Sequence, residues 1–560
     1  NYRSVIKNTL EFDPEVLKRY VNFMNNPDER TAVDQFGKGD KYFGVCTMMA
    51  TLPGLPMFGH GQVEGYTERY GMEYKRAYYD EQPDTWLVAR HEREISPLLH
   101  RRAQFAEVSD FLLYDLFTDY GTVNEDVYAY SNRHGTERAL VVYHNRYGHT
   151  SGWIRASCGF VEKTADGGKR LAQRTLADSF NLSRDGSMYV AFRDSVTALE
   201  YLHRACDIAE KGMRLELGAY KYHVFLDWRD LRDDGARPWG ALCHQLAGRG
   251  VSSLDDALRN LELAPVCAAL RSLLEVEVVE EFAAIVRDGR DGAGSAAEQA
   301  IDNAAGRVRV LLEETARFVQ SAGADPLGVR RKELGDVDDA VTLFRTRLSA
   351  AVNVPALEKY FSEEWSAQAA CVLPGKACET AAAVWGTVIA FCALEALAQV
   401  YDPADALRSV AHLFDALRLR ETFAERFAAL GLGDEERWKA AARLRAAFAH
   451  APWAAGAETI TGRSTALFSW LHDQDVAWLI GVHEHEGIRY FVREPFERLQ
   501  WWMALRALIG LASAPRPDRE AIRALEEEIQ ARMRAAGDAR YQVEALFESG
   551  RERHPTKLSS

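Results

Sequence analysis

The sequence predicts a multidomain protein in which a parallel α/β region, an antiparallel β-sandwich and an all-α domain follow one another. Helical and strand-like runs alternate over residues 1–117, and strand-length runs with a period of two fill residues 118–237. Ala, Leu, Arg and Glu at helical spacing dominate residues 238–560. At roughly 100 to 200 residues per domain, a chain of 560 residues has room for about three domains.

The first region reads as a helix, a short strand, a second helix, a short apolar segment and a long helix. The helices are expected over residues 1–20, 40–52 and 86–117, and the strand over residues 21–24. The helix over 40–52 is apolar nearly all round, which predicts that other elements cover it on more than one side. This alternation is typical of a parallel α/β unit.

The middle region predicts antiparallel strands, because apolar and polar residues alternate in it. The runs that carry this alternation are residues 126–133, 139–146, 187–194 and 221–228. In the helical region, the longest uncharged apolar run covers residues 380–394. It is shorter than the roughly 20 residues that cross a bilayer, so it predicts a buried helix and no membrane.

Charge and cysteine content exclude several classes of function. The formal net charge is −14 and the sequence pI is near 5.6, which argues against a nucleic-acid partner. The eight cysteines include no Cys-x-x-Cys pair, so neither a zinc module nor a disulfide framework is indicated. Scattered thiols favour a reducing, cytoplasmic location. His483 and His485 lack an evident third ligand, so no metal and no cofactor are expected.

The polar cluster after the first strand has two interpretations. In the first, Asn26 caps a helix whose first residue is Pro27, and Glu29 completes a capping box. In the second, Asp28 and Arg30 stand at the mouth of a site, because active sites of α/β proteins lie where strands end and helices begin. The two interpretations are compatible.

Two motifs in sequence order point to a known family. The run "FMNNPD", residues 23–28, matches the form Phe-x-x-Asn-His-Asp except at Pro27. The run "GLPMFGHGQVEG", residues 54–65, matches Gly-x-Pro-x-x-x-x-Gly-Glu-x-x-Gly except that Gln62 replaces the Glu. Residues 1–230 therefore resemble the end of the catalytic (β/α)8 TIM barrel of the α-amylase family, glycoside hydrolase family 13, followed by that family's C-terminal β-domain.

The resemblance implies an enzyme that acts on α-linked glucans or maltooligosaccharides by a retaining mechanism. Asp28 would be the family's third carboxylate, which holds the ring hydroxyls of the sugar being cleaved. The family's nucleophile and acid/base lie on earlier barrel strands, so we expect both to be upstream of this chain. Pro27 replaces a histidine that normally contacts the same sugar, and the Asn-x-Pro-Asp form is similar to α-glucan maltosyltransferases that use maltose 1-phosphate. Transfer and hydrolysis therefore both remain open.

Other polar residues of the two motif loops are candidates for binding the substrate. Each can also be a solvated loop residue. The substrate-binding candidates are Asn26, Arg30, His60, Gln62 and Glu64.

The chain begins at Asn1 and enters a helical pattern at once, so we expect it to be the C-terminal part of a longer protein. The expected partners are an α-glucan substrate and the N-terminal part of the barrel. The alternative is a catalytically inactive relative that binds glycans or serves as a scaffold. An Asp after the fourth barrel strand and a Glu after the fifth would distinguish the enzyme from this alternative.

Overall fold

The structure is a computed structural model in which the chain forms two compact units, residues 1–261 and residues 262–560. The described residues are 2–69, 76–164, 168–234, 237–287, 294–321, 334–361, 369, 372, 381–402, 406–449, 469–514, 516 and 518–552.

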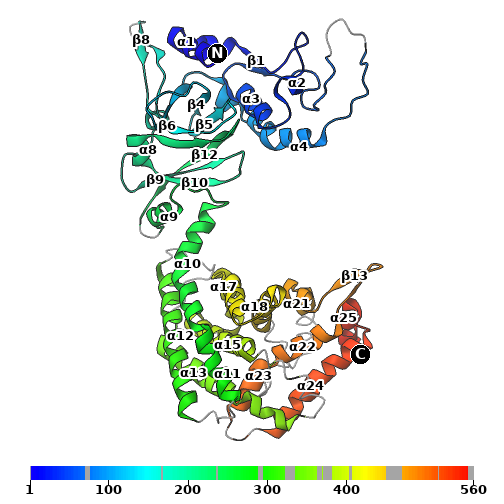
Figure 1. The fold of residues 1–560 in the computed structure, drawn as a ribbon. Coiled ribbons are helices and arrows are strands. Elements are labelled where there is room, and N and C mark those ends of the chain that lie inside the picture. Colours follow the sequence, from blue (N-terminus) through cyan, green and yellow to red (C-terminus); the bar gives the residue numbers. More distant parts are fainter. Residues whose placement is uncertain are drawn as a thin grey trace, which may run out of the picture. The chain divides into compact units, whose positions relative to one another are not determined.

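The first unit opens with a parallel α/β segment, as the sequence predicts (Figure 1). Strands β1 and β2 pair in parallel, with Val21 opposite Leu55 and Phe23 opposite Met57. Helices α2 and α3 connect the two strands. The elements are α1 (Tyr2–Phe12), η1 (Pro14–Arg19), β1 (Val21–Phe23), α2 (Ala32–Phe36), α3 (Asp40–Thr51) and β2 (Leu55–Met57).

Helix α3 is covered on several sides, which confirms the prediction from its apolar surface. Nine of its twelve residues are buried. At Gly44 the helix approaches the ring of Tyr143 so closely that a Cβ atom there would lie 2.2 Å from the ring carbon Cε2. Only glycine fits at this contact.

The expected helix over residues 86–117 is wrong in its second half. Three short helices are followed by a strand, whose Leu112, Leu113, Tyr114 and Leu116 are buried. This strand pairs with two neighbours, β4 (Val127–His134) and β6 (Thr150–Ser157), and this long-range pairing outweighs the helical pattern of the local sequence. The elements are α4 (Thr85–Glu94), α5 (Ser96–His100), α6 (Arg102–Ala106) and β3 (Leu112–Thr118).

The β region forms one eight-stranded antiparallel sheet rather than the two facing sheets of the expected sandwich. The strand order is β10-β9-β12-β5-β4-β3-β6-β11, and β7 and β8 form a separate two-stranded ribbon. The strands are β4 (Val127–His134), β5 (Glu137–His144), β6 (Thr150–Ser157), β7 (Phe160–Lys163), β8 (Lys169–Ala172), β9 (Met188–Asp194), β10 (Glu200–Arg204), β11 (Met213–Leu217) and β12 (Tyr222–Arg232).

The connection from β11 to β12 requires this sheet to curl. In the sheet order these strands are five positions apart, which in a flat sheet is about 24 Å. The five chain steps from Leu217 to Tyr222 span at most about 18 Å. The ends of β11 and β12 therefore approach each other across the curl.

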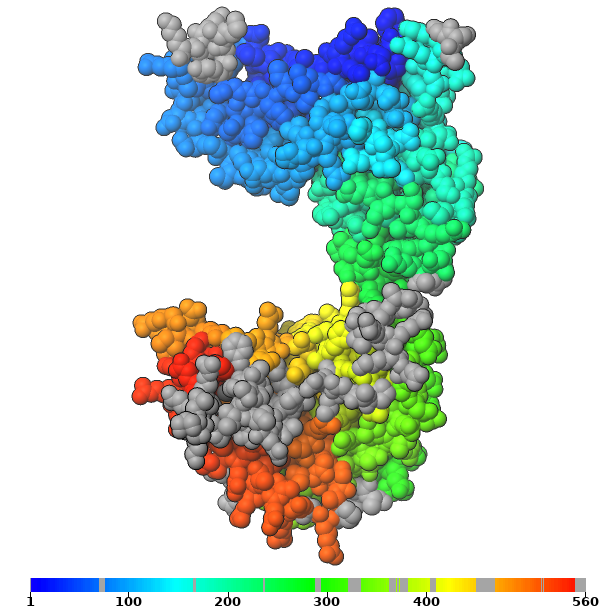
Figure 2. Space-filling model, turned by 180° about the vertical axis from the view of Figure 1, so that it is seen from behind, coloured from blue at the N-terminus to red at the C-terminus, as the bar shows by residue number. Residues whose placement is uncertain are grey.

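The α/β segment and the curled sheet share one hydrophobic core. Charged side chains join the two at the edge of this core. Arg90 of α4 contacts Asp40 of α3 at 2.8 Å and the hydroxyl of Tyr222 of β12 at 2.9 Å. Arg3 of α1 is fully buried and pairs with Asp115 and Glu125. Figure 2 shows the two parts as one continuous surface.

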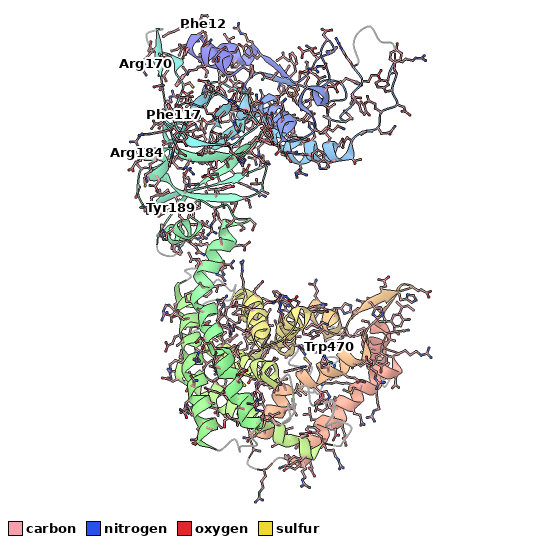
Figure 3. All side chains as sticks on the ribbon, in the orientation of Figure 1. Phe12, Phe117, Arg170, Arg184, Tyr189 and Trp470 are labelled. Carbon is pink, nitrogen blue, oxygen red and sulfur yellow. The ribbon has the colours of Figure 1, made fainter. Side chains whose placement is uncertain are left out.

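Further helices complete the first unit. Tyr189 of β9 is labelled in Figure 3 beside α9, and it packs with Trp239 in a small separate core. Helix α10 begins in this unit and crosses into the second. The helices are α7 (Leu176–Phe180), α8 (Ala205–Lys211), α9 (Trp239–Leu246) and α10 (Leu254–Leu273).

The second unit is helical around a large core that includes Trp470 (Figure 3). Helix α15 is apolar and long enough to cross a membrane, but 89% of its apolar window is buried in the fold, which confirms the prediction of a buried helix. The elements are α11 (Val276–Arg287), α12 (Ser295–Ser321), α13 (Val337–Asn353), η2 (Val354–Tyr360), α15 (Ala381–Tyr401), α16 (Ala406–Ala416), α17 (Leu419–Ala429), α18 (Asp434–Ala449), α21 (Gln474–Leu479), β13 (His483–His485), β14 (Ile488–Tyr490), α22 (Arg493–Met503), α23 (Leu505–Ala512), α24 (Arg519–Asp538) and α25 (Val543–Glu552).

The contact at Gly44 gives a stability prediction. Gly44→Ala places a methyl group inside the Tyr143 ring contact, and overpacking of this kind costs about 1 to 3 kcal/mol. This cost outweighs the roughly 1 kcal/mol that alanine gains over glycine in a helix. Urea denaturation should show a lower free energy of unfolding for the first unit.

The matched control is Gly306→Ala in α12, where the added Cβ meets nothing within 4 Å. This variant should be as stable as the wild type or more stable. A Gly44→Ala protein with unchanged stability would contradict the close packing of α3.

Candidate functional site

The two motif loops meet at the carboxyl ends of β1 and β2. Because these strands are parallel, the chain leaves both of them at the same edge. Met24, just after β1, lies with its Sδ 3.3 Å from Nε2 of Gln62, in the loop after β2. Asn25 packs on Gly59, where an added Cβ would lie 2.5 Å from the Asn25 amide nitrogen. The structure therefore brings together two segments about 35 residues apart in the sequence.

The cluster after β1 is a turn, so the expected helix start at Asn26 is wrong. The Asn26 side-chain oxygen accepts a hydrogen bond from the Asp28 backbone N–H at 3.0 Å, and the Asn26 carbonyl accepts one from Glu29 N–H at 3.2 Å. The helix begins later, at Ala32 of α2, with Thr31 as its cap. An asparagine can satisfy a turn with the same side-chain bond that it offers a helix, and here the turn is formed.

Arg69 fixes this turn from the second loop. Its guanidinium donates hydrogen bonds to the backbone carbonyls of Pro27, at 3.4 Å, and Asp28. Arg69 is not among the residues that the sequence predicts for the site, because it lies 41 residues from Asp28 and outside both motifs. Its contacts follow only from the pairing of the two strands.

Asp28 is held by its backbone while its side chain is left available. The residue is exposed, and among the described residues no hydrogen bond or ion pair engages its carboxylate. The turn bond from Asn26 and the bonds from Arg69 both act on main-chain atoms. A carboxylate that is positioned in this way can accept hydrogen bonds from a ligand without first breaking internal ones.

Gln62 is placed in the core rather than at the surface beside Asp28. It is 3% exposed, and its side-chain oxygen accepts a hydrogen bond from Gly59 N–H at 3.0 Å. Its amide nitrogen lies against the sulfur atoms of Met24, Cys46 and Met49. In this structure the Gln62 side chain therefore supports the second loop from beneath instead of facing solvent.

Tyr42 ties the same loop to helix α3. Its hydroxyl donates to the Gln62 carbonyl at 2.8 Å and lies 2.9 Å from Nε2 of His91. Burial lowers the pKa of His91 to about 4, while the charges of Glu64 and Glu94 oppose that shift. His91 is therefore neutral at physiological pH, as is expected of a buried imidazole that lies beside the Tyr42 hydroxyl.

The remaining candidates lie on the loops at different depths. His60 is exposed, and its ring centroid is 6.3 Å from that of Tyr66. Glu64 is partly buried, and its carbonyl accepts a hydrogen bond from Asp84 N–H at 2.9 Å. Arg30 is exposed, and its carbonyl accepts a hydrogen bond from the Gln35 side chain at 2.7 Å.

Exposed tyrosines stand on the continuation of the second loop. Glu68 accepts hydrogen bonds from the backbone N–H groups of Tyr78 and Tyr79 at 2.6 and 2.9 Å. The two tyrosines are 72% and 63% exposed. Burial acts to raise the pKa of Glu81, but hydrogen bonds from Thr67 and Glu68 outweigh it and lower that pKa. These bonds close the base of the loop.

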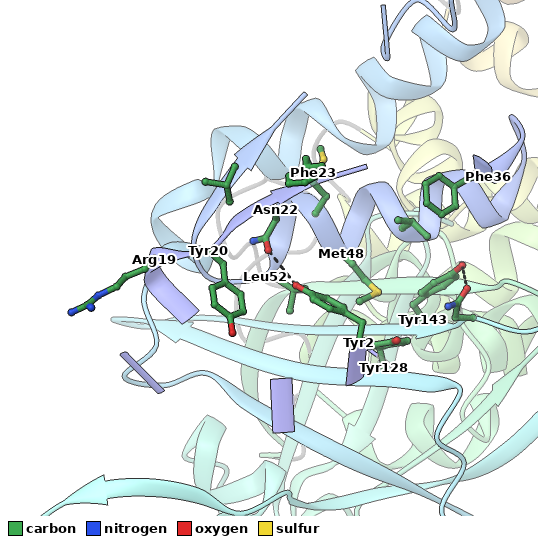
Figure 4. Close-up of a pocket in the computed structure, with 14 residues that line it drawn as sticks. Tyr2, Arg19, Tyr20, Asn22, Phe23, Phe36, Met48, Leu52, Tyr128 and Tyr143 are labelled. Carbon is green, nitrogen blue, oxygen red and sulfur yellow. Dashed lines mark hydrogen bonds between the residues drawn. The ribbon is translucent and has the colours of Figure 1, made fainter. Parts of the chain in front are cut away.

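A separate cavity of about 610 Å³ lies along the outer edge of β1 (Figure 4). Consecutive residues 19–23 line it together with Met48 of α3 and Leu52, which follows that helix. Asn22 accepts a hydrogen bond from the Tyr2 hydroxyl at 3.3 Å. Val21 and Phe23 are 46% and 41% exposed, so this edge of the parallel pair presents apolar side chains to solvent.

Within the described part of the chain, no group of three or more His, Cys, Asp or Glu residues is placed to hold a metal ion. His483 and His485 lie on the exposed strand β13.

Comparisons with known proteins give limited matches. No family model and no curated protein matches the sequence. Among solved structures, the chain is similar to an α-amylase from Geobacillus thermoleovorans in complex with acarbose, with 11% identity, a TM-score of 0.24 and coverage of 38% of this chain and 39% of that one. It is also similar to Amy13B of Eubacterium rectale, with 13% identity, a TM-score of 0.19 and coverage of 37% and 38%. The chain spans about two fifths of each structure, and the similarity to α-amylases is partial.

The setting of Gln62 predicts the effect of introducing a glutamate at this position. Gln62→Glu exchanges an amide that faces three sulfur atoms for a carboxylate at a buried position. Gly59 N–H can still donate to one carboxylate oxygen, but the other oxygen faces sulfur atoms, and leaving a buried charged group with incomplete hydrogen bonding costs about 1 to 3 kcal/mol or more. Chemical denaturation at pH 7 should therefore show a lower free energy of unfolding.

The pH dependence of this loss tests its cause. Burial raises the folded-state pKa of the new carboxyl group above its unfolded value of about 4.3. Stability is then closest to the wild type below about pH 4.3 and is lost as the pH rises through the folded-state pKa. A constant difference from pH 4 to pH 8 would contradict a buried carboxylate.

Proposed function

We propose that this chain is part of an α-amylase-like enzyme that acts on α-linked glucans, and that Asp28 binds the ring hydroxyls of the sugar at the bond to be cleaved. The observation that carries the proposal is the convergence of the two motif loops at the carboxyl ends of β1 and β2. Ligand sites of parallel α/β folds are built at this edge.

The position of Asp28 supports this role chemically. Cleavage of a glycosidic bond passes through an oxocarbenium-like transition state, and hydrogen bonds to the sugar hydroxyls that strengthen there contribute several kcal/mol. An exposed carboxylate on a turn fixed by Asn26 and Arg69 can accept such bonds. In this proposal, the retaining nucleophile and the acid/base are carboxylates of the earlier barrel strands.

The unpaired edge of β1 is an argument for a further strand that pairs with it. Among the described strands, β1 and β2 pair only with each other, and an isolated pair of this kind is marginal in water. The cavity beside β1 and the exposed Val21 and Phe23 fit an added strand with apolar side chains. We propose that this partner is the remainder of a (β/α)8 barrel.

We propose that the specific reaction is transfer from maltose 1-phosphate, because the Asn-x-Pro-Asp form around Pro27 resembles that of α-glucan maltosyltransferases that use this donor. A proline offers no imidazole at the position where the family has a histidine, so one sugar contact is absent. Analysis of the products formed with maltose 1-phosphate, and with and without inorganic phosphate, separates transfer from hydrolysis. Simple hydrolysis that is unaffected by either compound would contradict transfer.

Asp28→Asn tests the central role directly in the natural full-length protein. The change keeps the size of the side chain but removes the charge that complements the transition state. Loss of such a contact lowers the rate about 10²- to 10³-fold, so kcat/KM on α-glucans should fall by that factor. The unfolding midpoint should hardly change, because the side chain makes no internal bond among the described residues.

The matched control is Glu29→Gln, which removes a charge from the next residue of the same exposed turn. It should leave kcat/KM within about twofold, since surface charges contribute little. A stability control, Thr31→Ala, removes the cap of α2 and should cost about 0.5 to 2 kcal/mol with activity retained. Full activity of Asp28→Asn on every α-glucan would place the site elsewhere.

Hydrogen exchange tests the proposed partner. In residues 1–560 alone, amides of the peptide covering β1 should exchange quickly, whereas in the natural full-length protein an added strand should protect them. The control is β4, a central strand that should exchange at the same rate in both forms. Equal exchange of β1 in the two forms would contradict a strand added at this edge.

A further inference from the structure

Two tyrosines from neighbouring loops form a ring pair at one end of the curled sheet. Tyr147, in the loop between β5 and β6, is 83% exposed. Its ring centroid lies 6.5 Å from that of Tyr220, in the loop between β11 and β12, and the ring planes are inclined by 53°. The pair therefore presents two ring surfaces at an angle toward solvent.

Backbone hydrogen bonds hold these two loops together. Tyr220 N–H donates to the Arg146 carbonyl at 3.1 Å, and His144 N–H donates to the Lys221 carbonyl at 2.9 Å. The His144 imidazole lies 3.0 Å from the Gly218 carbonyl. Both tyrosines are thus attached next to main-chain contacts, so the rings need little further ordering when a ligand binds.

The backbone of Tyr220 is strained. Its φ of 56° lies in the left-handed region, which glycine and asparagine occupy at far lower cost than a bulky residue. Tyr220 is half-buried and packs against the core of the first unit, so part of its side chain is structural, and its ring also pairs with Tyr147. The part of the ring that lies outside the core, beside Tyr147, is what remains for contact with a ligand.

A cation and a further ring extend the tyrosine pair. The Lys41 ammonium lies 5.9 Å from the Tyr220 ring centroid and 5.7 Å from that of Phe36. Asn145, which is exposed, accepts a hydrogen bond from the Tyr143 hydroxyl at 2.9 Å. Aromatic faces and polar groups therefore alternate over this surface.

From this arrangement we infer that Tyr147 and Tyr220 form a carbohydrate-binding surface, distinct from the Asp28 loop, on which an α-glucan chain stacks. A sugar ring has apolar C–H faces that pack on aromatic rings, and its hydroxyls hydrogen-bond to neighbouring polar groups. Two small angled rings suit such a ligand better than a protein, whose stable interfaces bury roughly 1,200 Å² or more. The choice of an α-glucan rests on the proposed function.

Affinity electrophoresis in gels with soluble starch, and calorimetry with β-cyclodextrin, test this surface in the chain of 560 residues. The cyclic glucan has no chain end, so it reports on stacking rather than on a site for ends. Tyr147→Ala should weaken binding at least about fivefold. Tyr220→Gly should weaken it similarly. Glycine relieves the strained backbone but removes the packing of the ring on the core, so binding is measured well below the unfolding midpoint of this variant.

The matched control is Tyr120→Ala. Tyr120 is 94% exposed on another loop of the same sheet, and in the described residues no second ring pairs with it. This variant should bind both glucans like the wild type. Tyr147 and Tyr220 variants that bind both glucans as tightly as the wild type, or a wild type that binds neither glucan, would overturn the inference. A changed oligomeric state in size-exclusion chromatography, without a change in binding, would overturn it too, in favour of contact between copies.

The test of this surface can fail while the proposed function holds, and the reverse is also true. Starch binding that is lost in the tyrosine variants but kept in Asp28→Asn supports the surface, whatever that variant does to turnover. Conversely, starch binding unaffected by the tyrosines, together with loss of turnover in Asp28→Asn, rejects the surface and leaves the enzyme in place.

Discussion

The packing of helix α3 is the constraint on which the rest of the first unit depends. At Gly44 the helix backbone touches the Tyr143 ring of the curled sheet, and its other side faces the parallel strands. The same helix supplies Tyr42, which holds the Gln62 carbonyl, and Cys46, against which the Gln62 amide packs. The loop after β2 is thus built on α3, and its position beside Asp28 follows from that helix.

Several elements could be predicted from the sequence because their signals are local. Helix α3 and the buried helix α15 are marked by continuous apolar surfaces, and β4, β5, β9 and β12 by alternation. The two motifs also indicated that the ends of β1 and β2 would carry the polar residues. How the strands of the β region connect was not predictable, since alternation is the same in a sandwich and in a curled sheet.

The errors have physical causes that lie outside the local sequence. Asn26 offers the same side-chain bond to a helix and to a turn, and the turn is the form that Arg69 holds. The run over β3 is apolar enough for either a helix or a strand, and pairing with β4 and β6 decides. Arg69 itself is visible only when the two parallel strands are placed together. The candidate site was therefore only partly predictable, because its supports come from distant segments.

The central claim is that the two loops form one sugar site with Asp28 at its centre. A crystal structure of the natural full-length protein with a bound maltooligosaccharide tests it most directly. The account predicts glucosyl hydroxyls within hydrogen-bond distance of the Asp28 carboxylate, about 2.5 to 3.2 Å, with the loop after β2 forming the neighbouring wall. A sugar bound elsewhere in the protein, with the Asp28 side chain still in solvent, would contradict the account.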